Sequence, residues 1–125
     1  MIVLDASVVL ATVFGEPGRI DLSEVFDSAA MSTVNFSEVV AKLQERDFDK
    51  EGFDFVTGKL AEICHPLTAR QAFVAGEWRR QTRRLGLSTG DRCCLALALD
   101  LGAEVYTADR AWAGLDLGVK VRVVR

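Results

Sequence analysis

The chain has 125 residues, of which 50% are hydrophobic, and its formal net charge is −3. A chain of this size and apolar content can bury a core, so we expect one domain over residues 1–125. No apolar stretch approaches the roughly 20 residues that a membrane-crossing helix requires. The opening sequence, Met-Ile-Val-Leu-Asp, also lacks the basic segment of a secretion signal. These features predict a cytoplasmic protein without a membrane segment.

Cysteine and histidine are too few for a zinc site or a disulfide framework. The cysteines are Cys64, Cys93 and Cys94, an odd number without a Cys-x-x-Cys spacing, and His65 is the single histidine. We interpret the cysteines as small buried hydrophobic residues. We assign His65 no role, because no serine or cysteine nucleophile is spaced to use it.

The predicted elements are short apolar strands that alternate with helices. In the first half they are a strand at Ile2–Leu4, a helix at Ser7–Phe14, a loop at 15–18, a weaker helical segment at 20–29, a strand at 30–32 and a helix that follows residues 33–35. This last helix is the clearest of the first half, because Phe36, Val39, Val40 and Leu43 recur at helical spacing.

The second half continues the same alternation. It predicts an amphipathic helix at 53–63, an edge strand at 64–67, a long helix from Thr68 to Gly86, a buried helix from Ser88 to Gly102, and strands at 104–107 and 119–124. Such an order is typical of a three-layer α/β/α fold around a mostly parallel sheet, here of about five strands.

Four acidic residues lie where a predicted strand gives way to a helix or where a helix begins. They are Asp5, Glu38, Asp91 and Asp109. A carboxylate in such apolar surroundings loses solvation and needs a partner. Ligands of α/β folds bind beyond the carboxyl ends of the strands, where helix N-termini also point and would help to keep the carboxylates ionised. If the acids converge there, oxygen ligands favour Mg²⁺ or Mn²⁺.

Helix capping is the competing explanation. Asn35-x-x-Glu38 and Ser88-x-x-Asp91 both fit a capping box, and Asp5 and Asp109 could themselves cap the helices that follow them. The chain would then be a non-catalytic binding module. A phosphatase of the haloacid dehalogenase type is a weaker alternative, because its second aspartate is replaced here by Ser7.

Positive charge is concentrated in the second half of the chain. Residues 1–69 carry 12 acidic and 5 basic side chains, a net −7, whereas residues 70–125 carry 10 basic and 6 acidic side chains, a net +4. On one continuous helix, i, i+4 spacing would align four of the arginines in two ridges that could bind phosphates, although a solvated helix face fits them equally well. The candidate phosphate-binding residues are Arg79, Arg80, Arg83, Arg84, Arg92 and Arg110.

The four acids lie in the segments Met1–Ser7, Ser32–Leu43, Gly86–Ala98 and Val105–Trp112. In order, spacing and context these segments resemble the PIN-domain ribonucleases, and specifically the VapC-type toxins of toxin–antitoxin systems. The resemblance spans the chain. It implies an endoribonuclease that uses Mg²⁺ or Mn²⁺ to hydrolyse RNA phosphodiesters, with tRNA or ribosomal RNA loops as substrates.

The resemblance also implies roles for individual residues and partners. The implied metal ligands and catalytic residues are Asp5, Glu38, Asp91 and Asp109, the last directly or through water. Ser7 and Thr107 would be polar support beside them, and the arginines would hold RNA. The implied partners are a cognate VapB-type antitoxin and a second copy of the chain in a homodimer.

Overall fold

Five short parallel strands form the centre of the protein, which a computed structural model describes over residues 1–125. The strands are β1 (Ile2–Leu4), β2 (Ala29–Ser32), β3 (Cys64–His65), β4 (Glu104–Thr107) and β5 (Val121–Val123). Their order in the sheet is β3-β2-β1-β4-β5. The predicted α/β fold with a central parallel sheet is confirmed, and so is the edge position of β3.

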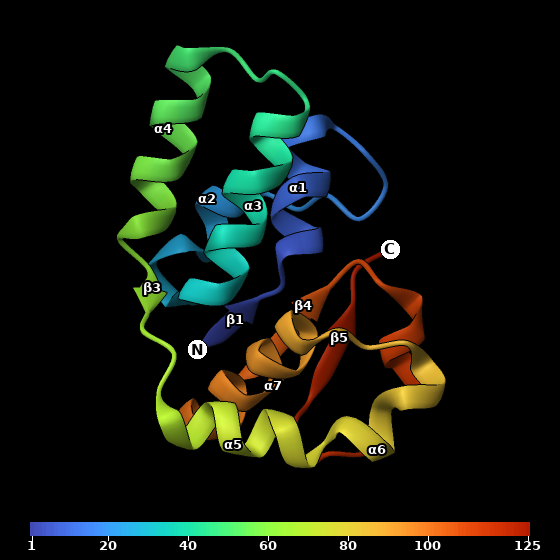
Figure 1. Cartoon of the computed structure of the whole chain (residues 1–125). Coiled ribbons are helices and arrows are strands. Elements are labelled where there is room, and N and C mark those ends of the chain that lie inside the picture. Colours follow the sequence, from blue (N-terminus) through green and yellow to red (C-terminus); the bar gives the residue numbers. More distant parts are fainter.

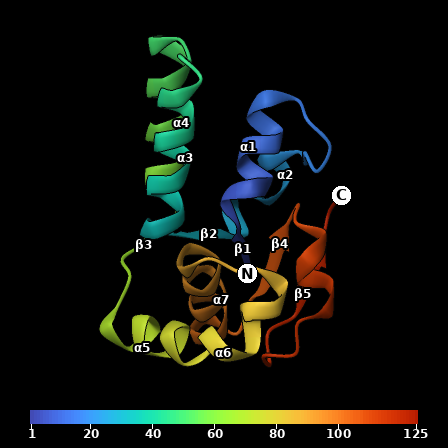
Figure 2. The same ribbon diagram turned by 45° about the vertical axis from the view of Figure 1, so that its right-hand side comes forward.

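Helices cover both faces of this sheet. They are α1 (Ala6–Phe14), α2 (Leu22–Val25), α3 (Thr33–Glu45), α4 (Lys50–Ala61), α5 (Ala69–Glu77), α6 (Arg79–Thr82) and α7 (Thr89–Leu101), with 3-10 turns η1 (Phe26–Ser28), η2 (Arg83–Leu85) and η3 (Arg110–Gly114). Figures 1 and 2 show α1–α4 on one side of the strands and α5–α7 on the other. None of these helices is both long and apolar enough to cross a membrane.

The alternation of side chains along the strands divides the core into two layers. Val3, Ala30 and Val105 pack toward α5 and α7, whereas Leu4 and Met31 pack toward α1, α3 and α4. β1 supplies both layers from adjacent residues. The first strand is therefore buried on both faces, which accounts for its uninterrupted apolar sequence.

Helix α7 is the buried helix that the sequence predicts. All residues from Arg92 to Ala98 are buried, including the free thiols of Cys93 and Cys94, while Cys64 is half-buried. The helix begins in a capping box at Ser88 and ends at Gly102, whose φ of 60° is the left-handed conformation that glycine adopts readily. These boundaries place Asp91 in the first turn.

The long helix predicted from Thr68 to Gly86 is interrupted, and this prediction was wrong. α5 ends at Glu77, α6 covers only Arg79–Thr82, and a 3-10 turn follows. The side chains of Trp78 and Thr82 are buried at the two breaks, and the Thr82 hydroxyl donates to the Trp78 carbonyl at 2.8 Å. Tertiary packing and this local hydrogen bond override the helical spacing.

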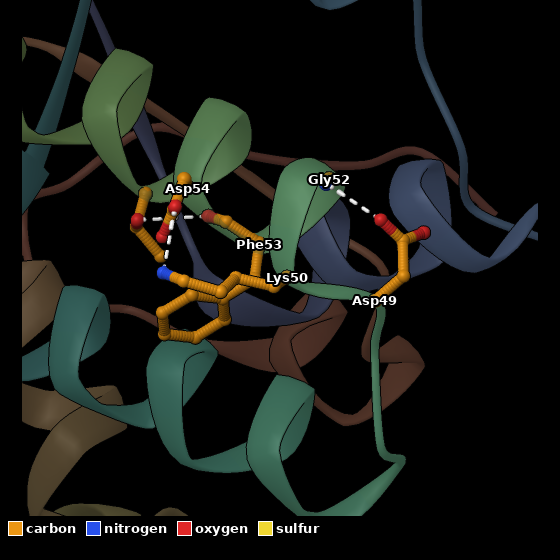
Figure 3. Close-up of polar contacts among 6 residues, drawn as sticks. Asp49, Lys50, Gly52, Phe53 and Asp54 are labelled. Carbon is orange, nitrogen blue, oxygen red and sulfur yellow. Dashed lines mark hydrogen bonds and ion pairs between the residues drawn. The ribbon is translucent and has the colours of Figure 1, made fainter.

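Helix α4 begins earlier than its apolar pattern indicates. Asp49 accepts a hydrogen bond from the Gly52 amide at 2.8 Å, and Lys50 pairs with Asp54 at 3.0 Å (Figure 3). These polar contacts extend the helix by three residues ahead of Phe53. The helix then runs beside α3 (Figure 1).

Candidate functional site

The order of the strands places the four acids at one edge of the sheet. The chain winds outward from β1 through β2 to β3 on one side and through β4 to β5 on the other, so the direction reverses between β1 and β4. Asp5 directly follows β1, and Asp109 lies two residues beyond β4. Glu38 from α3 and Asp91 from α7 join them around one cavity of about 310 Å³. The structure therefore places all four acids along one cavity.

Asp5 is the most enclosed of the four, with only 4% of its surface exposed. Ser7 Oγ donates to its Oδ2 at 2.6 Å, and Thr107 Oγ1 donates to the same oxygen at 2.9 Å. The amide of Ala108 in turn donates to Ser7 Oγ at 2.9 Å. Asp5 precedes α1, yet its side chain makes no capping bond. Capping does not explain this acid, and Ser7 and Thr107 contact it as expected.

Glu38 is not part of a capping box, and that prediction was wrong. The N-cap of α3 is Ser32, whose extended backbone lets its Oγ accept from the Val34 amide at 3.2 Å. Asn35 lies within the first turn instead. Its Nδ2 donates to Glu38 Oε1 at 2.8 Å and to the Gly90 carbonyl at 3.1 Å. Neither Asn35 nor Gly90 has a site role in the sequence prediction, because their contact joins residues far apart in the chain.

Asp91 and Asp109 do cap helices, as the alternative explanation predicts. The Ser88 amide donates to Asp91 Oδ2 at 2.8 Å, and the Asp91 amide donates to Ser88 Oγ at 3.2 Å. Asp109 Oδ1 accepts from the Ala111 amide at 2.9 Å. Each of these two acids uses one oxygen for the cap, so capping leaves the second oxygen unused.

The same division of oxygens holds for all four acids. The oxygens that accept no hydrogen bond within the protein are Asp5 Oδ1, Glu38 Oε2, Asp91 Oδ1 and Asp109 Oδ2. No lysine, arginine or histidine pairs with any of these acids. Lys42 lines the cavity, but its ammonium group pairs with Glu45 at 3.2 Å.

This donor set fits a hard divalent cation, because it consists of carboxylate oxygens that form no ion pair with a lysine or arginine. The acids are nevertheless not arranged for ligation in this structure. As placed, no three acidic, cysteine or histidine side chains lie close enough to hold one metal ion. Ligation by one ion would require the side chains to move inward.

Burial raises the pKa of three of the acids. The pKa of Asp5 rises from 3.8 to about 6, mainly through desolvation and further through the charges of Asp91 and Glu38, against the hydrogen bonds from Ser7 and Thr107. Desolvation also raises the pKa values of Glu38 and Asp91. The expectation that helix N-termini keep these groups ionised therefore omits desolvation, which is the larger effect on their pKa values.

The candidate phosphate-binding arginines fall into two groups. Arg79, Arg80, Arg83, Arg84 and Arg110 are exposed and have no carboxylate within ion-pair distance. Arg92 is buried, and its guanidinium donates to the Ala75 carbonyl at 2.8 Å and to Thr89 Oγ1 at 3.2 Å. The structure does not place Arg92 where phosphates could reach it, because it joins the last turn of α5 to α7. The apolar run that follows it in the sequence is the signal of this burial.

Comparison with known protein families matches residues 2–116 to the PIN domain. The chain belongs to the PIN-domain family. Its PIN fold is similar to that of VapBC from Salmonella typhimurium bound to DNA, with 16% identity, a TM-score of 0.76, and coverage of 97% of this chain and 96% of the other.

Two further PIN structures are similar over almost the whole chain. VapBC2 from Rickettsia felis, bound to a promoter DNA fragment, has 16% identity, a TM-score of 0.73 and 98% coverage of both chains. Mycobacterium tuberculosis VapC20, described as a Sarcin-Ricin loop cleaving toxin, has 19% identity, a TM-score of 0.69, and coverage of 96% of this chain and 99% of the other. No curated protein matches the sequence significantly.

Proposed function

We propose that this PIN domain is a Mg²⁺- or Mn²⁺-dependent endoribonuclease, the toxin of a VapBC-type toxin–antitoxin system that acts in the cytoplasm. One observation carries the proposal. Four carboxylates line a single cavity, each has one oxygen that accepts no hydrogen bond from the protein, and no lysine or arginine forms an ion pair with them. The similar structures that contain VapBC and VapC proteins support the assignment.

The chain's own residues would bind the ion and orient the substrate. Asp5, Glu38 and Asp91 would hold the ion through their free oxygens, and Asp109 would do so directly or through water. When bound, Mg²⁺ or Mn²⁺ neutralises charge on the phosphate and acidifies the attacking water. Ser7 and Thr107 keep Asp5 oriented toward the cavity.

The attacking group in this proposal is water. Cysteine and histidine are absent from the cavity lining, and the Ser7 hydroxyl is already donated to Asp5. The water oxygen bonds to phosphorus while the bond from phosphorus to the 3′ oxygen breaks. The products are a 5′-phosphate and a 3′-hydroxyl.

The substrate would be a loop of tRNA or ribosomal RNA, because unstacked bases in loops are the part of RNA that proteins read. The exposed arginines of α6 and η2, together with Arg110, would bind its phosphates. They have no carboxylate partners, so they remain available to an anion. We leave Arg92 out of this group because its guanidinium is buried.

A VapB-type antitoxin is the proposed partner. The similar structures from Salmonella typhimurium and Rickettsia felis are of VapBC. A basic side chain from such a partner would match the acidic cavity. A neighbouring reading frame that encodes a DNA-binding head and a basic tail, and whose product co-purifies with this chain, would support the pairing. Light scattering of the purified chain tests the proposed homodimer.

Cleavage of total cellular RNA by Asp91→Asn and Ser88→Ala tests the proposed function against the capping explanation. Ser88→Ala removes the capping hydroxyl but no metal ligand, so it should lose about 1 kcal/mol of stability and keep its activity. Asp91→Asn should lose cleavage while it keeps its fold. Wild-type products should carry 5′-phosphates, and chelation of divalent metal should abolish them.

The non-catalytic binding module remains the second candidate, because Asp91 and Asp109 do cap helices and the acids are not gathered for ligation. It predicts no cleavage of any cellular RNA by the wild-type protein in Mg²⁺ or Mn²⁺. It also predicts that Asp91→Asn and Ser88→Ala differ only in stability. The first result would remove the nuclease assignment, and the second would remove Asp91 from the proposed metal ligands.

A further inference from the structure

One buried amide links the helices that carry two of the acids. Asn35 in α3 has no exposed surface, and its Nδ2 bonds both Glu38 Oε1 at 2.8 Å and the Gly90 carbonyl at 3.1 Å. Gly90 directly precedes Asp91 in the first turn of α7. A single side-chain group therefore connects the Glu38 carboxylate to the backbone that carries Asp91.

Gly90 completes this contact by having no side chain. A Cβ built on Gly90 would lie 2.9 Å from Glu38 Cδ and closer still to its Oε1, so the carboxylate would have to leave its position. The φ of Gly90 is not positive, and glycine costs a helix about 0.5–1 kcal/mol relative to alanine. Backbone conformation does not require glycine here, whereas the close approach of Glu38 does.

We infer that Asn35 and Gly90 are positioning residues that together fix the place of Glu38 relative to Asp91. Asn35 holds one oxygen of Glu38, so that the other is presented to the cavity, and it ties α3 to α7. Gly90 leaves the space that the carboxylate occupies. Neither residue touches the substrate, and both act through Glu38. The inference rests on the proposed metal-dependent function of the same cavity.

The structure offers matched controls for both residues. Like Asn35, Gln71 is a buried amide whose carbonyl oxygen has no hydrogen-bond partner. It joins α5 to α7 through a 3.0 Å hydrogen bond from its Nε2 to Asp100. Asp100 lies in the last turn of α7, at the opposite end from Asp91. For Gly90 the control is Gly58, a helical glycine in α4 with open space around it.

The test compares Mn²⁺ affinity, measured by calorimetry on the full chain, among Asn35→Leu, Gly90→Ala, Gln71→Met and Gly58→Ala. We expect at least a tenfold weaker affinity for Asn35→Leu and Gly90→Ala, the range typical when a residue that orients a metal ligand is removed. Gln71→Met and Gly58→Ala should bind Mn²⁺ as the wild type does. Higher Mn²⁺ should partly restore RNA cleavage by Gly90→Ala.

Melting temperatures separate positioning from stability. Gly90→Ala should fold with a melting temperature no lower than a few degrees below the wild type, so it keeps the inference testable even if Asn35→Leu does not fold. Wild-type Mn²⁺ affinity in Gly90→Ala, or equal losses of affinity in Gly58→Ala, would overturn the positioning role. If the wild type neither binds Mn²⁺ nor cleaves RNA, both the proposed function and this inference fail together.

Discussion

The ionised Asp5 carboxylate destabilises the folded protein. It is 4% exposed and accepts two hydrogen bonds, yet burial and its acidic neighbours still raise its pKa to about 6. It contributes no capping bond in return. Titratable groups with strongly perturbed pKa values are found preferentially at functional sites, and this one lies in the cavity with three other acids.

The raised pKa of Asp5 predicts how stability depends on pH. Its folded-state pKa of about 6 exceeds its ordinary value of 3.8, so between these values the folded protein binds more protons than the unfolded chain. The metal-free protein should therefore lose stability as pH rises from about 4 to 6, by about 3 kcal/mol from this group. Urea unfolding in chelator across this range measures the effect.

Asp5→Asn isolates this contribution. Asparagine can accept the same bonds from Ser7 and Thr107 without a charge, so the variant should be more stable than the wild type at pH 8 in chelator, and the gain should shrink toward pH 4. Asp49→Asn, which changes an exposed capping acid, should show no gain. A less stable Asp5→Asn at pH 8 would indicate that the charge of Asp5 serves the fold.

At this scale the sequence predicts the acids but not their surroundings. Ser88 and Asp91 form the capping box that their spacing predicts. Asn35 fits the same pattern, but Ser32 at the end of β2 is the N-cap instead. Spacing alone does not show which of two nearby polar residues is the N-cap, because the end of the preceding strand determines where the helix begins. The close approach of Gly90 and Glu38 is tertiary and leaves no local signal.

The segment from α5 to η2 shows the same limit at the scale of elements. The apolar runs of β1 and α7 and the alternating pattern of β4 identify those elements almost to the residue, because each pattern follows the burial of its element. The sequence pattern of the arginine segment predicts one helix. The helix is interrupted, because Trp78 and Thr82 are buried against the rest of the molecule. The two predicted ridges of arginines therefore do not lie on a regular helix.

This segment still predicts a salt-dependent effect on RNA binding. Replacement of Arg79 and Arg83 by glutamine should raise KM for RNA and leave kcat unchanged, since removal of a phosphate-binding charge weakens the binding of substrate and transition state alike. The slope of log affinity against log salt should become shallower by about 0.7 for each phosphate that the protein no longer neutralises. Stability should not change, because both side chains are exposed and neither forms an ion pair.

Lys50 and Lys59 provide the control for this charge change. Both are exposed on α4, where their ion pairs are with the nearby acids Asp54 and Glu62. Their replacement by glutamine removes the same charge and should leave both KM and the salt slope unchanged. If the double substitution of Lys50 and Lys59 has the same effect as that of Arg79 and Arg83, then net charge, and not the arginine segment, governs RNA binding.

At the scale of the whole molecule, the acidic cavity is formed by elements that are distant in the chain. The strand order β3-β2-β1-β4-β5 puts β1 beside β4, so Asp5 and Thr107 meet although they come from opposite ends of the sequence. Helices α3 and α7 then approach each other over the same edge of the sheet. Alternating elements predict a parallel sheet of about five strands, but not this order, which long-range pairing decides.

If these four carboxylates together bind a divalent cation, the cation should raise the free energy of unfolding of the whole protein. The free energy of unfolding should be measured with Mn²⁺ or Mg²⁺ and with chelator, for the wild type and for Asp5→Asn. Metal at about 100 times its dissociation constant should stabilise the wild type by about 2.7 kcal/mol and leave Asp5→Asn unchanged. Identical wild-type stabilities in chelator and in millimolar metal would contradict metal binding by these carboxylates.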